Sequence, residues 1–428
     1  MEHPLLRICS KTILDYFNED CWNLVLGYVP LQDIIRTERA SRQWQKMVLT
    51  YLSHTRICIK MNYYRIWDDN EVTGVVQNVR CAFLRETYMA SFKSWTCKLG
   101  TSVVAGYCTE KSFNVIGENC PNLEGVTFLN IPEELLLNNQ YENFRRLERL
   151  RFIDCFSMTD NSLSQYIASP VLEELLIFFN DQVTGQCFTN IRSPNFKSLD
   201  FKYCKALACR LLAVASHHFS ELRKLVLECI NAVNIEGDFR EKEEPFDAMV
   251  LVLDKTTKLE YLSTWEFGRY LDNFFESVCQ LSCLKELEID TYGTDKNIAE
   301  VARRCPQLRI LKFQACNELT GRGLRTACVH AGARLTNLHM PHNKHLTDND
   351  VEACVRACPN LMELNVQHCS LITRDVLPRA AAARRAVRAH PPLRLLWSVY
   401  DLRRNDPVRP IIFRLHTFKV RQSTTLYP

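Results

Sequence analysis

The sequence predicts an α/β fold in which short strand–turn–helix units stack side by side as a solenoid. The first observation is a recurrence of Leu-x-x-Leu-type pairs, which are 24–27 residues apart with a single gap of 37. The second is that further residue types keep a fixed place behind these pairs, which unrelated amphipathic helices would not do. The pairs begin at Leu123, Leu147, Leu172, Phe196, Leu222, Leu259, Leu284, Leu308, Leu335 and Leu361.

Each element of the unit follows from its residue types. The Leu-x-x-Leu-x-Leu segment alternates like a short strand with one buried face. A Cys or Asn eight residues after the first apolar position can fill or hydrogen-bond the next turn. A Thr at twelve residues predicts a helix N-cap, and a proline after the helix ends it. These slots hold Cys155, Asn180, Cys204, Cys316, Asn343 and Cys369 at the turn, Thr159, Thr184, Thr320, Thr347 and Thr373 at the cap, and Cys120, Cys305 and Cys358 before the strand.

The repeat resembles the cysteine-containing subclass of leucine-rich repeats over residues 111–400, in about eleven units. This resemblance implies a horseshoe arc with parallel strands on its concave face and helices outside. The gap of 37 holds the acidic stretch 236–245, which predicts an insertion near 231–255, most simply an exposed loop. Residues 59–110 carry strand-like fragments without a clean register, which predicts degenerate capping repeats.

Residues 12–58 have a different pattern, whose apolar spacing predicts three short helices. So small a unit buries little surface and should lean on another element. Its apolar residues either supply a surface for a partner helix or cap the exposed end of the solenoid. The residues concerned are Val25, Leu26, Val29, Pro30, Leu31, Ile34 and Ile35.

The same segment resembles an F-box. The matching residues are the acidic pair Glu19-Asp20, Leu24 to Leu26, Tyr28-Val29-Pro30, Asp33-Ile34, and Arg42 with Trp44. The family usually has Leu-Pro where Phe17-Asn18 stands here, and Asn18 can still cap the helix. The resemblance implies docking on the Skp adaptor of cullin–RING ubiquitin ligases. The implied contact residues are Leu24, Val25, Leu26, Val29, Pro30, Leu31, Ile34, Ile35 and Trp44.

Composition narrows the cellular setting. No apolar run is long enough to span a bilayer, and the amino terminus lacks the apolar core of a signal peptide, so neither is expected. The 20 cysteines lie in long periodic segments, which favours reduced, buried thiols in the cytoplasm or nucleus over a disulfide framework. The net charge of +4 divides into +9 for residues 374–428 and −5 for the rest, and the negative charge of the arc argues against nucleic acid as its partner.

No motif for catalysis or cofactor binding is found. The sequence lacks a phosphate-binding glycine loop, a His-Glu-x-x-His pair and a nucleophile elbow. The pairs Cys279/Cys283 and Cys354/Cys358 have helical spacing, but without a Cys-x-x-Cys pair they are better interpreted as core thiols than as zinc ligands. We therefore expect no catalytic residue, no metal and no cofactor.

The candidate substrate site is the concave face, onto which the residues between the buried leucines project. Large apolar side chains on a nominally exposed face suit a contact with a protein partner. Ordinary solvated variation, or aromatic residues covered by a long loop, are the alternatives. The candidate residues are Arg149, Arg151, Leu176, Phe178, Lys202, Tyr261, Trp265, Glu286, Glu288 and Asp290.

The two resemblances together imply a substrate-recognition subunit of a Skp–cullin–F-box ubiquitin ligase. Residues 12–58 would bind the Skp adaptor and through it the cullin, and the arc would hold one or more protein substrates. The main alternative is a leucine-rich-repeat scaffold or inhibitor that acts independently of ubiquitin. A second alternative is a nucleic-acid-associated protein that uses the basic carboxyl end. Within that end, residues 401–428 form either a closing cap or a loose basic tail.

Overall fold

The fold is described from a computed structural model, which divides into two compact units, Met1–Cys155 and Phe156–Pro428. Each unit is treated by itself below. The residues described are 19–29, 33–34, 37, 40–54, 57–60, 84–90, 124–137, 146–228, 244–265, 272–290, 293–314, 319–387, 392–397 and 411–415.

The first unit begins with a pair of contacting helices, α1 (Glu19–Tyr28) and α3 (Arg42–His54). The rings of Trp22 and Trp44 meet edge to face, with centroids 5.8 Å apart. Ser41 accepts a hydrogen bond from the Trp44 amide at 3.1 Å, as an N-cap residue does. Of the predicted helix between them, Asp33, Ile34 and Thr37 are helical, and the remainder lies outside the described residues.

The same unit contains strands β1 (Ile57–Lys60), β2 (Leu84–Ala90), β3 (Gly125–Leu129) and β4 (Arg149–Ile153), which pair in parallel and in chain order. A short helix, α7 (Glu133–Leu137), follows β3. Capping repeats are predicted for the segment 59–110. Strand β2 lies within this segment, and β1 overlaps its first two residues. The other residues of that segment, and Leu123, lie outside the described residues.

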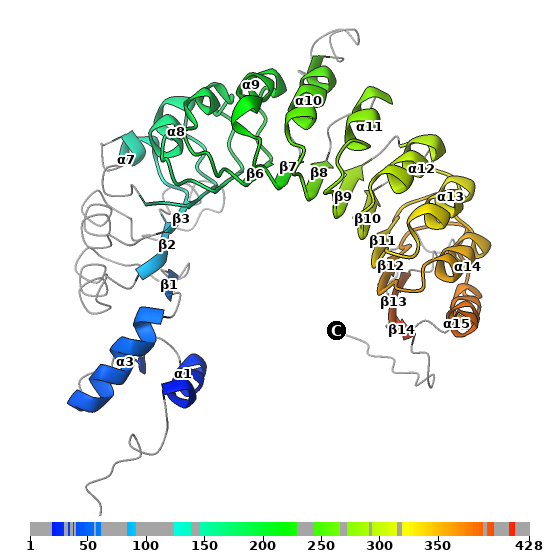
Figure 1. The fold of residues 1–428 in the computed structure, drawn as a ribbon, viewed down its shortest axis with the longest axis horizontal. Coiled ribbons are helices and arrows are strands. Elements are labelled where there is room, and N and C mark those ends of the chain that lie inside the picture. Colours follow the sequence, from blue (N-terminus) through cyan, green and yellow to red (C-terminus); the bar gives the residue numbers. More distant parts are fainter. Residues whose placement is uncertain are drawn as a thin grey trace, which may run out of the picture. The chain divides into compact units, whose positions relative to one another are not determined.

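The second unit is a succession of strand–helix repeats that bend into an arc, with the strands inside and the helices outside (Figure 1). Neighbouring strands from β5 to β13 are parallel, and β14 closes the sheet antiparallel to β13. The strands are β5 (Glu174–Phe178), β6 (Ser198–Lys202), β7 (Lys224–Glu228), β8 (Tyr261–Trp265), β9 (Glu286–Asp290), β10 (Ile310–Gln314), β11 (Asn337–His339), β12 (Glu363–Asn365), β13 (Leu393–Trp397) and β14 (Ile411–Leu415).

The helices alternate with these strands along the chain, which is the predicted order of elements. They are α8 (Asp160–Ile167), η6 (Gln186–Asn190), α9 (Cys209–Ala215), η7 (Ser216–His218), α10 (Glu244–Lys255), α11 (Asp272–Val278), α12 (Asp295–Arg304), α13 (Gly321–Ala331), α14 (Asp348–Ala357) and α15 (Val376–Ala386). No described helix is long and apolar enough to cross a bilayer.

A ladder of leucines holds the repeats of the second unit together. One leucine in each strand pairs in register with the corresponding leucine of the next strand, and all of them are buried. Burying each such side chain stabilises the fold by about 1.5–3 kcal/mol. The paired residues are Leu175, Leu199, Leu225, Leu262, Leu287, Leu311, Leu338, Leu364 and Leu395.

The Cys or Asn slot ties each turn to the repeat before it. The Asn343 side chain donates to the Leu319 carbonyl at 3.0 Å and accepts from the amides of His345 and Leu346 at 2.8 and 3.1 Å. In the cysteine version the Cys204 thiol donates to the Ile177 carbonyl at 3.6 Å. The predicted role of this slot is confirmed at these positions. Cys316 of the same slot lies outside the described residues, as does Cys120 of the slot before the strand.

The threonine slot forms a second link between repeats. Thr159, Thr320 and Thr347 are N-caps of α8, α13 and α14, as predicted. The Asp295 carboxylate at the start of α12 accepts from both the amide and the hydroxyl of Thr320, at 2.8 and 2.6 Å. Asp160 binds Thr184, and Asp348 binds Thr373, in the same way.

Two predicted caps differ from the structure. Thr184 precedes only η6, whose N-cap is Gly185, and Asp160 binds the amides of Thr184, Gly185 and Cys187. Gly185 itself has a φ of 98°, which favours glycine. After Thr373, α15 begins at Val376 with Asp375 as its N-cap.

The insertion and the tail are more regular than the sequence indicates. Residues 244–255 of the predicted insertion form α10, a repeat helix whose residues Ala248, Met249, Val252 and Leu253 are buried. The sequence pattern assigns these residues to the insertion because they directly follow an acidic run, which conceals their helical spacing. Residues 229–243 lie outside the described part. In the tail, residues 411–415 form β14, and the remainder of 401–428 is not described.

The asparagine slot gives a test of the repeat. Asn343→Leu should lower the free energy of unfolding by about 1–3 kcal/mol, because it removes three hydrogen bonds from buried backbone groups. Asn343→Cys should cost less, since a thiol serves the same carbonyl in other repeats. Urea unfolding followed by circular dichroism measures both. Equal costs for the two variants would show that volume, and not hydrogen bonding, decides this slot.

Candidate protein-interaction surfaces

The predicted concave side chains of the second unit alternate with buried side chains along their strands. In β5 the residues Glu174, Leu176 and Phe178 are half-buried, and they alternate with the buried Leu175 and Ile177. Lys202, Tyr261, Glu286 and Glu288 occupy the equivalent positions of later strands. Trp265 and Asp290 end β8 and β9, but their side chains lie outside the described part of the structure.

Arg149 and Arg151 belong to β4 of the first unit, where both are half-buried. The Arg149 guanidinium pairs with Glu124 at 3.2 Å and with Glu148 at 3.3 Å. Its charge is therefore largely compensated within its own unit, and Arg149 is a weaker candidate for substrate contact than the sequence alone indicates.

Lysines of the second unit's concave face pair with acids of neighbouring strands. Lys202 binds Glu228 at 2.8 Å, and Lys224 binds the buried Asp200 at 2.7 Å. Glu228 also accepts a hydrogen bond from Ser263 at 2.8 Å. Burial alone would lower the pKa of Lys202, but the hydrogen bond and charge of Glu228 outweigh it and raise that pKa. The sequence places these charged residues on the concave face, but it does not reveal that they form ion pairs with one another.

Around β9 the acids exceed the bases. Lys312 of β10 is the shared partner of Glu286, at 2.6 Å, and of Glu288, at 3.2 Å. The hydroxyl of Tyr261 lies 3.4 Å from the Glu288 carboxylate and donates to it. Burial lowers the pKa of Lys312, and the two carboxylates more than offset that effect. Two carboxylates around one ammonium leave this part of the face negative.

An aromatic cluster lies where β5 and β6 end. The rings of Phe179 and Tyr203 stack with centroids 4.6 Å apart, and Phe178 meets them edge to face at 4.6 and 5.5 Å. Phe179 is 39% exposed and Tyr203 is 37% exposed. The sequence identifies Phe178 but misses the other two, because they follow the strands and fall outside the alternating pattern.

The amino-terminal helices divide the predicted adaptor residues into two groups. Leu24, 66% exposed, and Val25 lie on the surface of α1, and Tyr28, 84% exposed, lies one turn after Leu24. Leu26 and Ile34 are buried within the unit, so their role is to pack its core and not to contact a partner. Val29 and Trp44 are half-buried, whereas Pro30, Leu31 and Ile35 lie outside the described residues.

The described residues bear on metal binding and on the reactivity of thiols. Within this part of the chain no three His, Cys, Asp or Glu side chains are arranged to hold a metal ion. Burial raises the pKa of Cys155, Cys204 and Cys305 to about 12, which keeps these thiols protonated and unreactive at neutral pH. A groove of about 570 Å³ between α11 and α12 is lined by Glu300, Arg303 and Arg304, which pair with one another.

Comparison with known proteins supports the architecture. No protein-family model matches the chain, and no curated protein matches it. Among solved structures, Rad7 from the Rad7–Elc1 complex of yeast matches 84% of this chain and 90% of its own, with 19% identity and a TM-score of 0.57. An internalin of Listeria monocytogenes matches 74% of this chain and 85% of its own, with 12% identity and a TM-score of 0.44.

The chain is a leucine-rich-repeat solenoid. The leucine ladder, the parallel strands with helices outside, and the match to Rad7 over most of both chains agree on this fold. The predicted fold class is thereby confirmed. A surface built of repeats in this way presents a row of neighbouring strand positions to a large partner, which supports a protein-interaction role.

A histidine on the concave face should make the stability of the fold depend on pH. His339 of β11 lies 2.9 Å from Glu363 of β12. Burial lowers the pKa of His339 and outweighs the opposite effect of Glu363. The neutral imidazole is thus favoured in the folded state, and its contribution to stability is present above the unfolded pKa of about 6.5 and lost as the pH falls further.

Unfolding in urea at pH 7.5 and 5.5 measures this effect. The wild type should lose stability on acidification, and His339→Gln, which cannot titrate, should lose less. Parallel losses in the two proteins would contradict the assignment of His339 as a titrating group buried in its neutral form.

Proposed function

We propose that this protein is the substrate-recognition subunit of a Skp–cullin–F-box ubiquitin ligase. The amino-terminal helices bind the Skp adaptor, and through it the cullin, while the repeat solenoid holds a protein substrate. The observation that carries this proposal is that α1 keeps Leu24, Val25 and Tyr28 outside its own core. Large apolar groups exposed together on one helix mark an interaction surface.

The geometry of α1 supports a helix-to-groove contact. Leu24 and Tyr28 are four residues apart, and Val25 and Tyr28 are three apart, so their side chains share one side of the helix. Leu26, Ile34 and Val48 form the core of the unit instead. The unit can therefore fold around these residues and still present an apolar strip to a partner helix or groove.

The match to Rad7 adds support of a coarser kind. Rad7 was solved in complex with a second protein, Elc1, so a solenoid of comparable length is compatible with a bound partner chain. A sequence identity of 19% supports a shared fold and nothing more specific. The choice of the Skp adaptor as partner rests on the F-box resemblance of residues 12–58.

In this function the protein performs no chemical step and needs no cofactor. Holding a substrate and a ubiquitin-charged enzyme in one assembly raises their effective concentration, which accelerates transfer without a catalytic residue in this chain. We place its activity in the cytoplasm or nucleus, because most of the described cysteines are buried as thiols and not joined in disulfides, as in proteins of reducing compartments.

A scaffold or inhibitor that works without ubiquitin is the second candidate. The partly exposed aromatic residues at the ends of β5 and β6 suit it equally, because they require only a protein partner. It differs in one respect: the strip on α1 would then have no part in the function, and altering it would leave the protein's effect on its partner unchanged.

Co-elution of the full chain with recombinant Skp adaptor tests the proposal. The wild type should form a stable complex, and the double variant Leu24→Asp and Tyr28→Asp should weaken binding by roughly tenfold or more, because it places two charges in an apolar contact. Leu251→Asp is the matched control, since Leu251 is 55% exposed on α10, and it should bind as the wild type does.

Circular dichroism of each variant checks that the helices are retained. Failure of the wild type to bind the adaptor, or equal binding by the Leu24/Tyr28 variant, would overturn the proposal. Substitution of Leu26 or Ile34 would be uninformative here, because both residues belong to the core of the unit.

A further inference from the structure

We infer that the partner of the solenoid presents a net-basic, extended segment with an apolar side chain, which docks on Phe178, Phe179 and Tyr203 and runs across the concave face toward Glu286 and Glu288. This inference rests on the part of the proposed function in which the solenoid holds a protein. It assigns to that protein a chemistry that its binding segment must have.

The first argument is the backbone conformation of the aromatic residues. Six described residues other than glycine have a positive φ, and each of them lies in the turn that follows a strand. They are Asn130, Asp154, Phe179, Tyr203, His342 and His368. Asn, Asp and His tolerate this left-handed conformation best among such residues, whereas bulky aromatic residues are outliers in it. Phe179 and Tyr203, with φ of 56° and 55°, are therefore the two exceptions in a repeated slot.

The fold does not need aromatic residues at this slot. The amides of Phe179 and Tyr203 donate to the carbonyls of Lys202 and Glu228 at 2.9 and 2.8 Å, and the His342 amide donates to Gln367 at 2.8 Å in the same way. The backbone bond is thus independent of the side chain. His342 and His368 also stack, with ring centroids 4.5 Å apart, so the better tolerated residue can supply the stacking as well.

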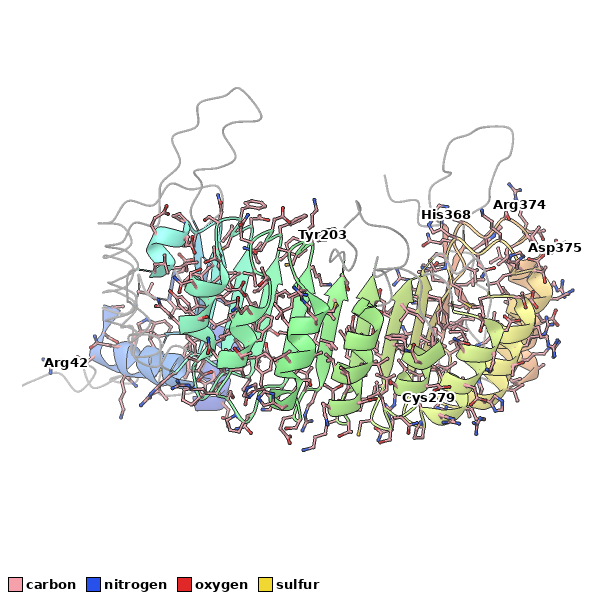
Figure 2. The ribbon with its side chains drawn as sticks, turned by 90° about the horizontal axis from the view of Figure 1, so that it is seen from above. Arg42, Tyr203, Cys279, His368, Arg374 and Asp375 are labelled. Atoms are coloured by element: carbon pink, nitrogen blue, oxygen red, sulfur yellow. The ribbon has the colours of Figure 1, made fainter. Side chains whose placement is uncertain are left out.

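The strain is not offset by complete burial. Both residues keep more than a third of their surface exposed. Figure 2 places Tyr203 and His368 at the edge of the second unit toward which the strand arrows point, with Cys279 at the opposite edge. Strained residues persist where the surroundings or the function require them, and a partner that covers the rings would supply the missing burial.

The second argument is charge. The described inward positions of β5 to β13 hold six acids and four Lys or Arg residues, with His339 in addition. All four bases already bind acids of neighbouring strands: Lys312 is shared by Glu286 and Glu288, and the others are Lys202, Lys224 and Arg394. An additional cation from a partner would complete this group, whereas an additional anion would be repelled.

The spacing sets the length of the segment. From β6 to β9 there are three strand steps, or roughly 15 Å at the usual separation of strands. Glu288 is in register with Asp200, which precedes Tyr203 by three residues, or roughly 10 Å along the strand. The two offsets combine to roughly 18 Å, which an extended peptide covers with about five or six residues. The segment should therefore carry an apolar residue and a Lys or Arg about five or six positions apart.

The test uses a phage-displayed library of random peptides of about 12 residues, selected on the purified full-length chain. Enriched peptides should be net basic with a large apolar residue, and their binding should weaken as salt increases. Enrichment of acidic peptides, of peptides without an apolar residue, or of none at all would overturn the inference.

The double variant Phe179→His and Tyr203→His separates recognition from folding. It should bind an enriched peptide at least about tenfold more weakly, while its melting temperature should equal or exceed that of the wild type, because histidine is better tolerated at a positive φ. Unchanged peptide binding, or a clear fall in melting temperature, would overturn the inference, the latter because it would assign the rings to the folded core.

The double variant Glu286→Gln and Glu288→Gln tests the charge independently. It should weaken peptide binding and reduce its salt dependence, and an unaltered salt dependence would contradict the electrostatic part. The variant Leu24→Asp with Tyr28→Asp should bind the peptide normally even though it loses the Skp adaptor. Failure of adaptor binding and failure of peptide recognition are therefore separate results.

Discussion

Burial of leucine between neighbouring repeats is the constraint on which the rest of the structure depends. A repeat of this length has one apolar face and nothing of its own to cover it, so it is stable only between two similar units. In the second unit the leucines of successive strands pair in register from Leu175 to Leu395. Because strand side chains alternate between faces, this fixed burial directs the other residues of each strand to the concave side.

Polar links between repeats refine that stacking. The Asn or Cys at the turn bonds the preceding repeat, and an Asp at a helix start binds the Thr of the following repeat. These bonds satisfy backbone groups that would otherwise be buried without partners. They also give some of the buried cysteines a structural role: the thiols of Cys155 and Cys204 donate to carbonyl groups of the preceding repeat, and burial raises the pKa of both thiols.

The concave face combines two kinds of side chain with different roles. Most of its lysines are engaged by acids of neighbouring strands, so they help to hold the sheet in register and offer little charge to a partner. The aromatic residues at the strand ends remain partly exposed, and the acids near β9 exceed their bases. Recognition by this face thus depends on few positions, as is usual for protein interfaces. The exposed strip on α1 is a second surface, and it is carried by a separate unit.

The sequence by itself determined the solenoid, the spacing of its units and the alternation of buried and concave residues, because each depends on a local periodicity of apolar residues. Only the tertiary structure decided which charges pair, since Lys312 and Glu286 are brought together by strand register. It also decided that Leu26 is core while Tyr28 is exposed, because the packing of α1 against α3 selects the buried side. The left-handed conformation of Phe179 and Tyr203 likewise became visible only in the folded chain. There the amide of each residue donates a hydrogen bond to a carbonyl of the next repeat, and this bond is made at a positive φ that aromatic residues ordinarily avoid.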